Sequence, residues 1–148
     1  MLNKWVDGSM VRGYGDIAQL VLRVALGIVF AWHGYDKIFN TGMQGVAGFL
    51  GSVGIPIPEI MAYILAYGEL ISGICLIIGL FTYLAAKFAI VVAIVAFFTV
   101  HLPNGFNVAN GGYEFIMLIF AAAIAVLVMG PGKHSADVTW RHKPAGGM

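Results

Sequence analysis

The chain carries, at residues 15–37, the stretch GDIAQLVLRVALGIVFAWHGYDK. Nearly every residue from Ile17 to Trp32 is apolar, and a helix of this length can cross a bilayer core of ~30 Å. Arg23 is the exception, because its guanidinium keeps its charge and must point toward a partner, a cavity or the interface. The stretch therefore predicts a membrane-spanning helix whose charged residue has a polar partner elsewhere in the chain.

The composition of the whole chain points to a membrane protein. Of its 148 residues, 60% are hydrophobic and only 10% are charged, against about 25% charged residues in soluble domains. A soluble protein of this size could not bury so much apolar surface, so lipid must act as part of its solvent. The net charge is +1 and there is no basic run, which excludes nucleic acid as a partner. We predict one membrane domain, residues 1–148.

Four apolar segments indicate four spans and an all-α fold, a four-transmembrane-helix antiparallel bundle. The predicted spans are residues 17–35, 60–81, 84–100 and 113–129. Only Thr82 and Tyr83 separate the second span from the third, which requires a tight hairpin. The connection 39–59 is too long for a turn and predicts a short interfacial helix between the first two spans. After the glycines at 130 and 132 the tail is expected to be short and solvated.

Positive charges predict the orientation of the bundle. Among the basic residues outside the middle of a span, Lys37 alone lies on the side of the membrane that carries the connection 39–59, which we call the loop side. The others lie on the side of the two termini. These are Lys4, Arg12, Lys87, Lys133, Arg141 and Lys143. By the positive-inside rule both termini are cytoplasmic, and we expect a multi-pass protein of the inner membrane of a bacterium. No small-residue cleavage site follows the first helix, so we expect it to be retained as an anchor.

Two ionisable residues are predicted near mid-membrane. Counting helical rise from Tyr35 and from Ile60 puts Arg23 and Glu69 both ~14–18 Å from the loop side, so we expect them to pair. Such a pair either fixes the helix register or lines a site. Each residue also lies on a stripe of small residues, which favours close packing of the first helix on the second and leaves room for a flat ligand.

A second polar cluster is predicted toward the loop side. His33 ends the first span, His101 ends the third, and Tyr113 and Glu114 begin the fourth. Any one of these residues at a helix end has an ordinary explanation, but two imidazoles and a carboxylate together can bind a carbonyl oxygen and carry its proton. We take His33, His101 and Glu114 as candidate catalytic residues. The same histidines could ligate haem, but without an attachment motif haem is disfavoured, and no metal site is predicted.

Several short motifs together resemble those of the DoxX family, over about residues 15–137. They are LRVALG at 22–27, WHG at 32–34 with Lys37, GEL at 68–70 with Ser72 and Gly73, HLPNGF at 101–106, GGYE at 111–114 and GPG at 130–132. Ser72 stands where another glycine is expected. The resemblance implies a four-helix membrane protein of the DoxX/DoxD group, whose relatives include a subunit of a thiosulfate:quinone oxidoreductase and a membrane partner of superoxide dismutase and a sulfurtransferase.

The resemblance favours a quinone-linked oxidoreductase subunit. In this hypothesis quinone is the cofactor, and Arg23, Gly34, Glu69 and Tyr113 join the three candidate catalytic residues as ligand-binding residues. Because Cys75 is the only cysteine, electrons would come from a partner redox protein, membrane-bound or soluble, or from a diffusible thiol or sulfur donor. A non-catalytic scaffold or accessory subunit of a larger membrane complex is the alternative, and a small-molecule carrier is the third.

Overall fold

A computed structural model of the protein describes residues 14–141, and every regular element in that range is a helix. The long helices are α2 (Gly15–Asp36), α4 (Pro58–Ile78), α5 (Thr82–Ala96) and α6 (Glu114–Met129). The shorter ones are η1 (Lys37–Thr41), α3 (Gly42–Ser52), η2 (Phe97–His101), η3 (Leu102–Asn104), η4 (Val108–Asn110) and α7 (Ala136–Arg141). The all-α fold class is therefore confirmed.

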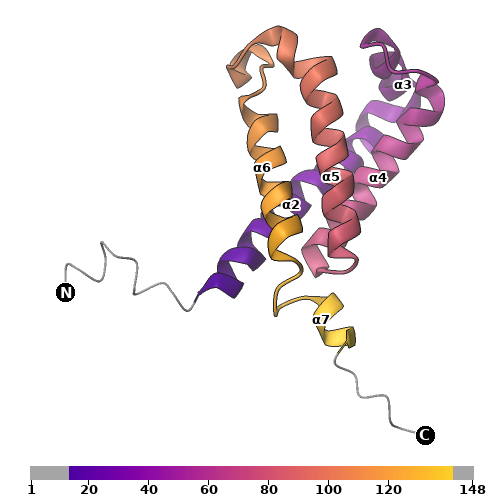
Figure 1. The fold of residues 1–148 in the computed structure, drawn as a ribbon. Coiled ribbons are helices and arrows are strands. Elements are labelled where there is room, and N and C mark those ends of the chain that lie inside the picture. The colour runs from indigo at the N-terminus through magenta and orange to yellow at the C-terminus, as the bar shows by residue number, and fades with distance from the viewer. Residues whose placement is uncertain (1–13, 142–148) are drawn as a thin grey trace, which may run out of the picture.

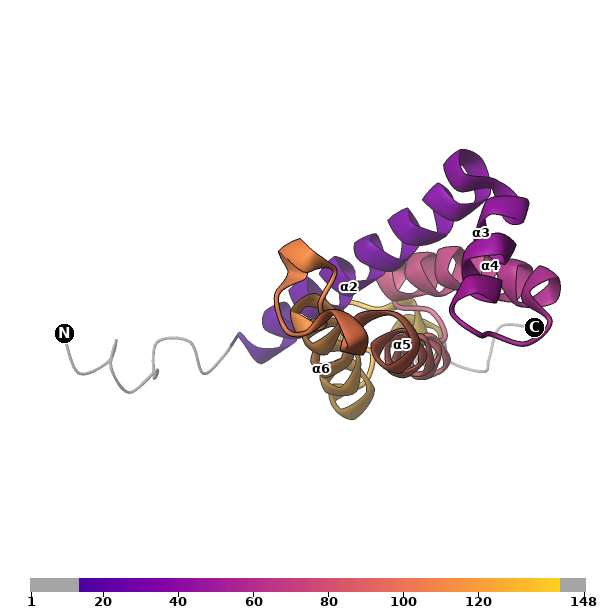
Figure 2. The same cartoon turned by 90° about the horizontal axis from the view of Figure 1, so that it is seen from above.

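The four long helices form an antiparallel bundle in which α2 packs on α4 and α5 packs on α6 (Figure 1). Contacts of α4 with α5 and of α2 with α6 close the ring, and the view in Figure 2 shows the two pairs crossing. Within residues 14–141, three runs of consecutive helical residues contain a stretch long and apolar enough to span a membrane: 15–52 (α2, η1 and α3), 58–78 and 82–104. Helix α6 is apolar but has 16 residues. We call the end that carries the start of α2 the terminal end, and the opposite one the loop end.

The close packing of α2 on α4 depends on two pairs of small residues. A methyl group added at Gly27 would lie 2.8 Å from the carbonyl oxygen of Gly73, and one added at Gly34 would lie 2.7 Å from that of Ala66. Real side-chain carbons do not approach backbone atoms so closely, so only glycine lets the two helices meet here. The small-residue stripes expected from the sequence thus lie at a helix interface.

At the loop end a short helix covers the top of α4, as the sequence predicts for the connection 39–59. The chain leaves α2 through the π-helical turn η1 and reverses at Gly42, whose φ of 74° is accessible to glycine without strain. Helix α3 then buries Val46 and Leu50 against Ala62 of α4. Helix α3 therefore covers the loop end of the bundle on the side of α4.

The hairpin between α4 and α5 comes earlier than predicted. Helix α4 ends at Ile78 and α5 begins at Thr82, so the turn is residues 79–81 rather than Thr82 and Tyr83. Gly79 takes the left-handed conformation, with φ 71° and ψ 40°, that commonly ends a helix. The carboxylate of Asp137 accepts hydrogen bonds from the backbone N–H groups of Phe81 and Thr82, at 2.8 and 2.9 Å, and so caps α5.

The expectation of a solvated tail is wrong for residues 130–137, which we call the C-terminal strap. The Gly130 carbonyl accepts a hydrogen bond from Gln19, and Ser135 is 5% exposed. The ammonium of Lys133 lies 2.7 Å from the carboxylate of Asp16, and this partner raises the pKa of Lys133. The strap docks because helix ends present unpaired backbone groups, which its polar atoms satisfy.

Candidate functional site

A cavity of about 340 Å³ opens within the ring of helices toward the loop end. Its walls come from α2, η1, α3, α4, α5, η2 and α6 and from Ile55, between α3 and α4, and most of the lining residues are apolar. The apolar lining is Val29, Phe30, Phe49, Leu50, Ile55, Leu65, Val92, Val95, Ala96, Val100, Phe115, Ile116 and Ile119. Thr99 and four ionisable residues, His33, Lys37, Glu69 and His101, complete it. A cavity of this size and character is typical of a small-molecule site.

An ion pair lies in the wall of this cavity. The ammonium nitrogen of Lys37 is 2.7 Å from a carboxylate oxygen of Glu69, and the two side chains are 21% and 7% exposed. The pair has one member at each of two packed helices, because Lys37 begins η1 directly after α2 and Glu69 lies within α4. A charge pair in apolar surroundings is costly to build, so its position in a cavity wall favours a ligand role over simple stabilisation.

Both histidines of the cavity have one ring nitrogen fixed by the backbone. Nδ1 of His33 lies 2.8 Å from the carbonyl oxygen of Val29, and Nδ1 of His101 lies 2.7 Å from that of Gly111. A carbonyl only accepts, so Nδ1 is the protonated nitrogen in each ring. In the neutral form of such a ring Nε2 is the unprotonated nitrogen and can accept a hydrogen bond from a ligand.

Two of the four ionisable residues of the cavity lie on π-helical turns. Lys37 is the first residue of η1 and His101 is the last residue of η2. A π turn inserts a residue into the helix and rotates the side chains that follow, and such turns are frequent at functional sites. The carboxylate of Asp36 stabilises the first of them by accepting hydrogen bonds from Asn40 and Thr41.

Glu114 and Tyr113 lie beside the cavity and do not belong to its lining. A carboxylate oxygen of Glu114 accepts a hydrogen bond of 2.9 Å from the backbone N–H of Val108, which ties the start of α6 to the loop. The ring of Tyr113 packs between those of Phe97 and Phe106. In this structure both residues therefore hold the loop 102–113 in place.

The expected pairing of Arg23 with Glu69 is wrong. Nη1 of Arg23 donates to the carbonyls of Leu76 and Ile77, at 2.5 and 3.2 Å, and Nη2 donates to that of His134 at 2.7 Å. These contacts cap the last turn of α4 and hold the strap at the terminal end. Arg23 is 1% exposed and lies outside the cavity.

Helix register explains the error. The sequence argument aligned Tyr35 with Ile60, but in the structure Gly34 packs against Ala66 and Leu70, because α4 continues past the end of α2 beneath α3. Glu69 is thus level with Gly34, which is eleven residues, or ~16 Å of helix, away from Arg23.

The candidate residues thus divide into two groups. His33, His101 and Glu69 meet at the cavity. The others lie outside its lining: Gly34 packs α2 on α4, Arg23 caps α4, and Tyr113 and Glu114 hold the loop. Sequence reasoning missed Lys37 as a site residue, although its spacing of four from His33 places the two on one helix face. Within residues 14–141 no group of three His, Cys, Asp or Glu side chains is placed to hold a metal ion.

The chain matches one family model and resembles two curated relatives. A family model described as DoxX matches residues 18–102. A relative from Bacillus subtilis (strain 168) named "Putative oxidoreductase CatD" is 35% identical over 111 residues, which cover 75% of this chain and 79% of the relative. A relative from Haemophilus influenzae (strain ATCC 51907 / DSM 11121 / KW20 / Rd) named "Uncharacterized protein" is 29% identical over 132 residues, 86% of each chain. No solved structure matches the chain.

Proposed function

This chain belongs to the DoxX family of membrane proteins, and on that premise we propose that its cavity binds the head group of a quinone within a membrane oxidoreductase. The observation that carries the proposal is the Lys37–Glu69 ion pair in the wall of an otherwise apolar cavity of about 340 Å³. An apolar ring needs apolar walls, and its oxygen atoms need a few placed polar groups. The cavity offers both.

Each polar residue has a role in this proposal. The Lys37 ammonium donates a hydrogen bond to a ring oxygen, and Glu69 holds the ammonium in place from α4. His33 and His101 exchange protons with the ligand through Nε2. A bound quinone supplies two-electron, two-proton redox chemistry, and with one cysteine in the sequence the electrons come from a partner redox protein or a diffusible thiol or sulfur donor.

The family relationship supports this choice among the three hypotheses. The CatD relative carries the word oxidoreductase in its name, and the matched region 18–102 contains all four ionisable residues of the cavity. A scaffold needs no cavity with an ion pair in its wall. We further propose that the protein lies in a bacterial inner membrane with both termini in the cytoplasm, as the distribution of basic residues favours.

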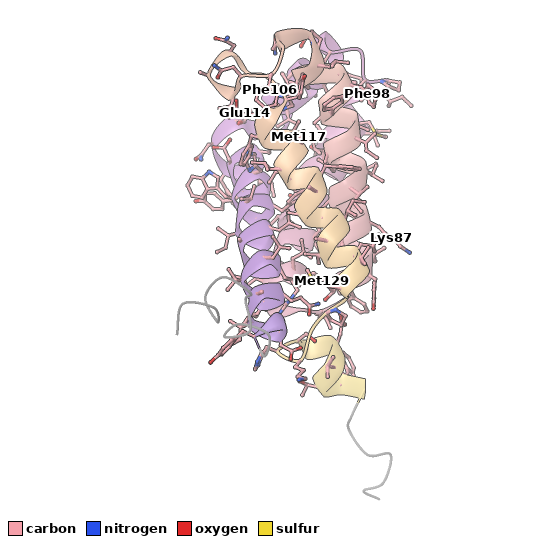
Figure 3. All side chains as sticks on the ribbon, turned by 60° about the vertical axis from the view of Figure 1, so that its left-hand side comes forward. Lys87, Phe98, Phe106, Glu114, Met117 and Met129 are labelled. Atoms are coloured by element: carbon pink, nitrogen blue, oxygen red, sulfur yellow. The ribbon has the colours of Figure 1, made fainter. Side chains whose placement is uncertain are left out.

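Calorimetric titration with decylubiquinone tests the proposal on protein reconstituted into nanodiscs, with empty nanodiscs as the blank for partition into lipid. We expect saturable binding in the wild type and a loss of about tenfold in affinity for Lys37→Met, the cost of one charge-assisted hydrogen bond. Lys87→Met is the matched control, because Lys87 is exposed and points away from the bundle (Figure 3). Absence of saturable binding to the wild type, or equal loss in both variants, contradicts the proposal.

A further inference from the structure

We propose that the cavity selects the reduced form of its ligand, a ring with free hydroxyl groups, through Nε2 of His33 and His101. The inference rests on the proposed function and adds to it the chemical state of the ligand. It starts from the two backbone contacts that fix Nδ1 of each ring as a donor, to Val29 and to Gly111.

Hydrogen-bond matching gives the preference. A neutral imidazole whose Nδ1 carries the proton has Nε2 as an acceptor only. A quinone oxygen is also only an acceptor of hydrogen bonds. Its lone pair would face the lone pair of Nε2, so no hydrogen bond can form between them. A hydroxyl of the reduced ring donates to Nε2 and makes a hydrogen bond there. Both histidines are among the residues that line the same cavity.

The remaining polar groups do not cancel this preference. The Lys37 ammonium donates equally well to a carbonyl or to a hydroxyl oxygen, and Glu69 is held by Lys37 at 2.7 Å. The carboxylate, like Nε2, is an acceptor and favours a hydroxylated ring. Every ionisable residue of the lining other than Lys37 therefore prefers a ligand that donates a hydrogen bond.

The histidine variants can be designed to remove Nε2 and to keep Nδ1. The side-chain nitrogen of asparagine occupies nearly the place of Nδ1, so His33→Asn and His101→Asn retain a donor toward Val29 and Gly111. Glutamine reaches the place of Nε2 and offers an amide oxygen there, so His33→Gln and His101→Gln restore an acceptor. His134→Asn is the matched control, because this exposed residue belongs to the strap at the terminal end.

The test compares dissociation constants for decylubiquinone and for decylubiquinol, measured under argon in nanodiscs. We expect the wild type and His134→Asn to bind the quinol about tenfold more tightly than the quinone. Each asparagine variant removes one of the two acceptors and should therefore lose about half of the free-energy difference behind that ratio, through weaker quinol binding, while its affinity for the quinone stays unchanged. The glutamine variants should recover part of the ratio.

Three results would overturn the inference. They are equal affinity of the wild type for the two forms, an unchanged ratio in both asparagine variants, and a parallel loss of quinone and quinol binding in them. In each case saturable binding of the quinone would still support the proposed function. If neither the quinone nor the quinol binds, both the inference and the proposed function are contradicted. Melting temperatures are recorded for all variants, and because the two histidines lie on different helices, either variant that folds is sufficient.

Discussion

Arg23 on α2 and Lys37, directly after α2, show how two basic residues acquire different roles from their surroundings. Arg23 is enclosed by backbone carbonyls at the end of α4, where helix geometry leaves acceptors unpaired and a planar guanidinium can bridge several of them. Lys37 meets a carboxylate in a cavity wall. The charges of Arg23 and Lys37 follow from the sequence. The partner of each residue depends on which turn of α4 lies opposite it in the folded protein.

Arg23 should be a stability residue rather than a ligand residue. Arg23→Lys keeps the charge but has a single nitrogen, which cannot reach the carbonyls of Leu76 and His134 together. We expect it to lower the free energy of unfolding by about 2–4 kcal/mol, from lost charge-assisted hydrogen bonds and carbonyls left unpaired. Thermal melting in detergent measures this, with Lys87→Met as the exposed control. An unchanged melting temperature, or a quinone affinity that falls in the folded protein, would contradict this role.

At the scale of elements, the helix faces were predictable and their register was not. The spacing of Gly27 and Gly34 on α2, and of Ala66 and Gly73 on α4, follows from helix geometry and identifies the two faces that meet. The relative position of the helices depends on Gly42 and α3, which let α4 extend past α2. That offset is a property of the tertiary fold, and for this reason the predicted pairing of Arg23 with Glu69 failed.

The α2–α4 contact gives a prediction with an internal control. Gly34→Ala places a methyl group 2.7 Å from the Ala66 carbonyl oxygen and against the backbone of Leu70, so the helices must separate. We expect a loss of about 3 kcal/mol in stability. Gly48→Ala, in α3, meets nothing within 4 Å and should leave stability unchanged or raise it by up to about 1 kcal/mol. Denaturation of the two variants in the same detergent gives the comparison, and equal melting temperatures would show that the helices are not in this close contact.

At the scale of the whole molecule, composition and periodicity were enough to predict a helical membrane protein, and the site was predicted in part. His33, His101 and Glu69 were selected because ionisable residues are rare in apolar helices, and the structure places them at one cavity. The strap was missed because most of its contacts use the backbone carbonyls of Gly130 and His134 and the carboxylate of Asp137. Its ion pair, Lys133 with Asp16, joins residues that are far apart in the sequence. Backbone acceptors leave no pattern in a sequence.

The orientation of the molecule depends on charges at the terminal end. Lys4, Arg12 and Lys143 lie outside the described residues, and the side chain of Arg141 is also not described. Lys133 is exposed on the strap, and Lys37, the basic residue of the loop end, is held by Glu69. Because lysine and arginine near span ends are retained in the cytoplasm, we expect the loop end and the cavity mouth to face the opposite side.

Single-cysteine labelling in intact cells decides this orientation. In a Cys75→Ala background, Ser52→Cys places an exposed thiol at the end of α3, and Trp140→Cys places one on α7 at the terminal end. A membrane-impermeant maleimide should label the first in intact cells and the second only after permeabilisation. The reverse pattern would invert the topology. Equal labelling of both sites in intact cells would show that the terminal end and the loop end do not lie on opposite sides of the membrane, against the reading of the long helices as spans.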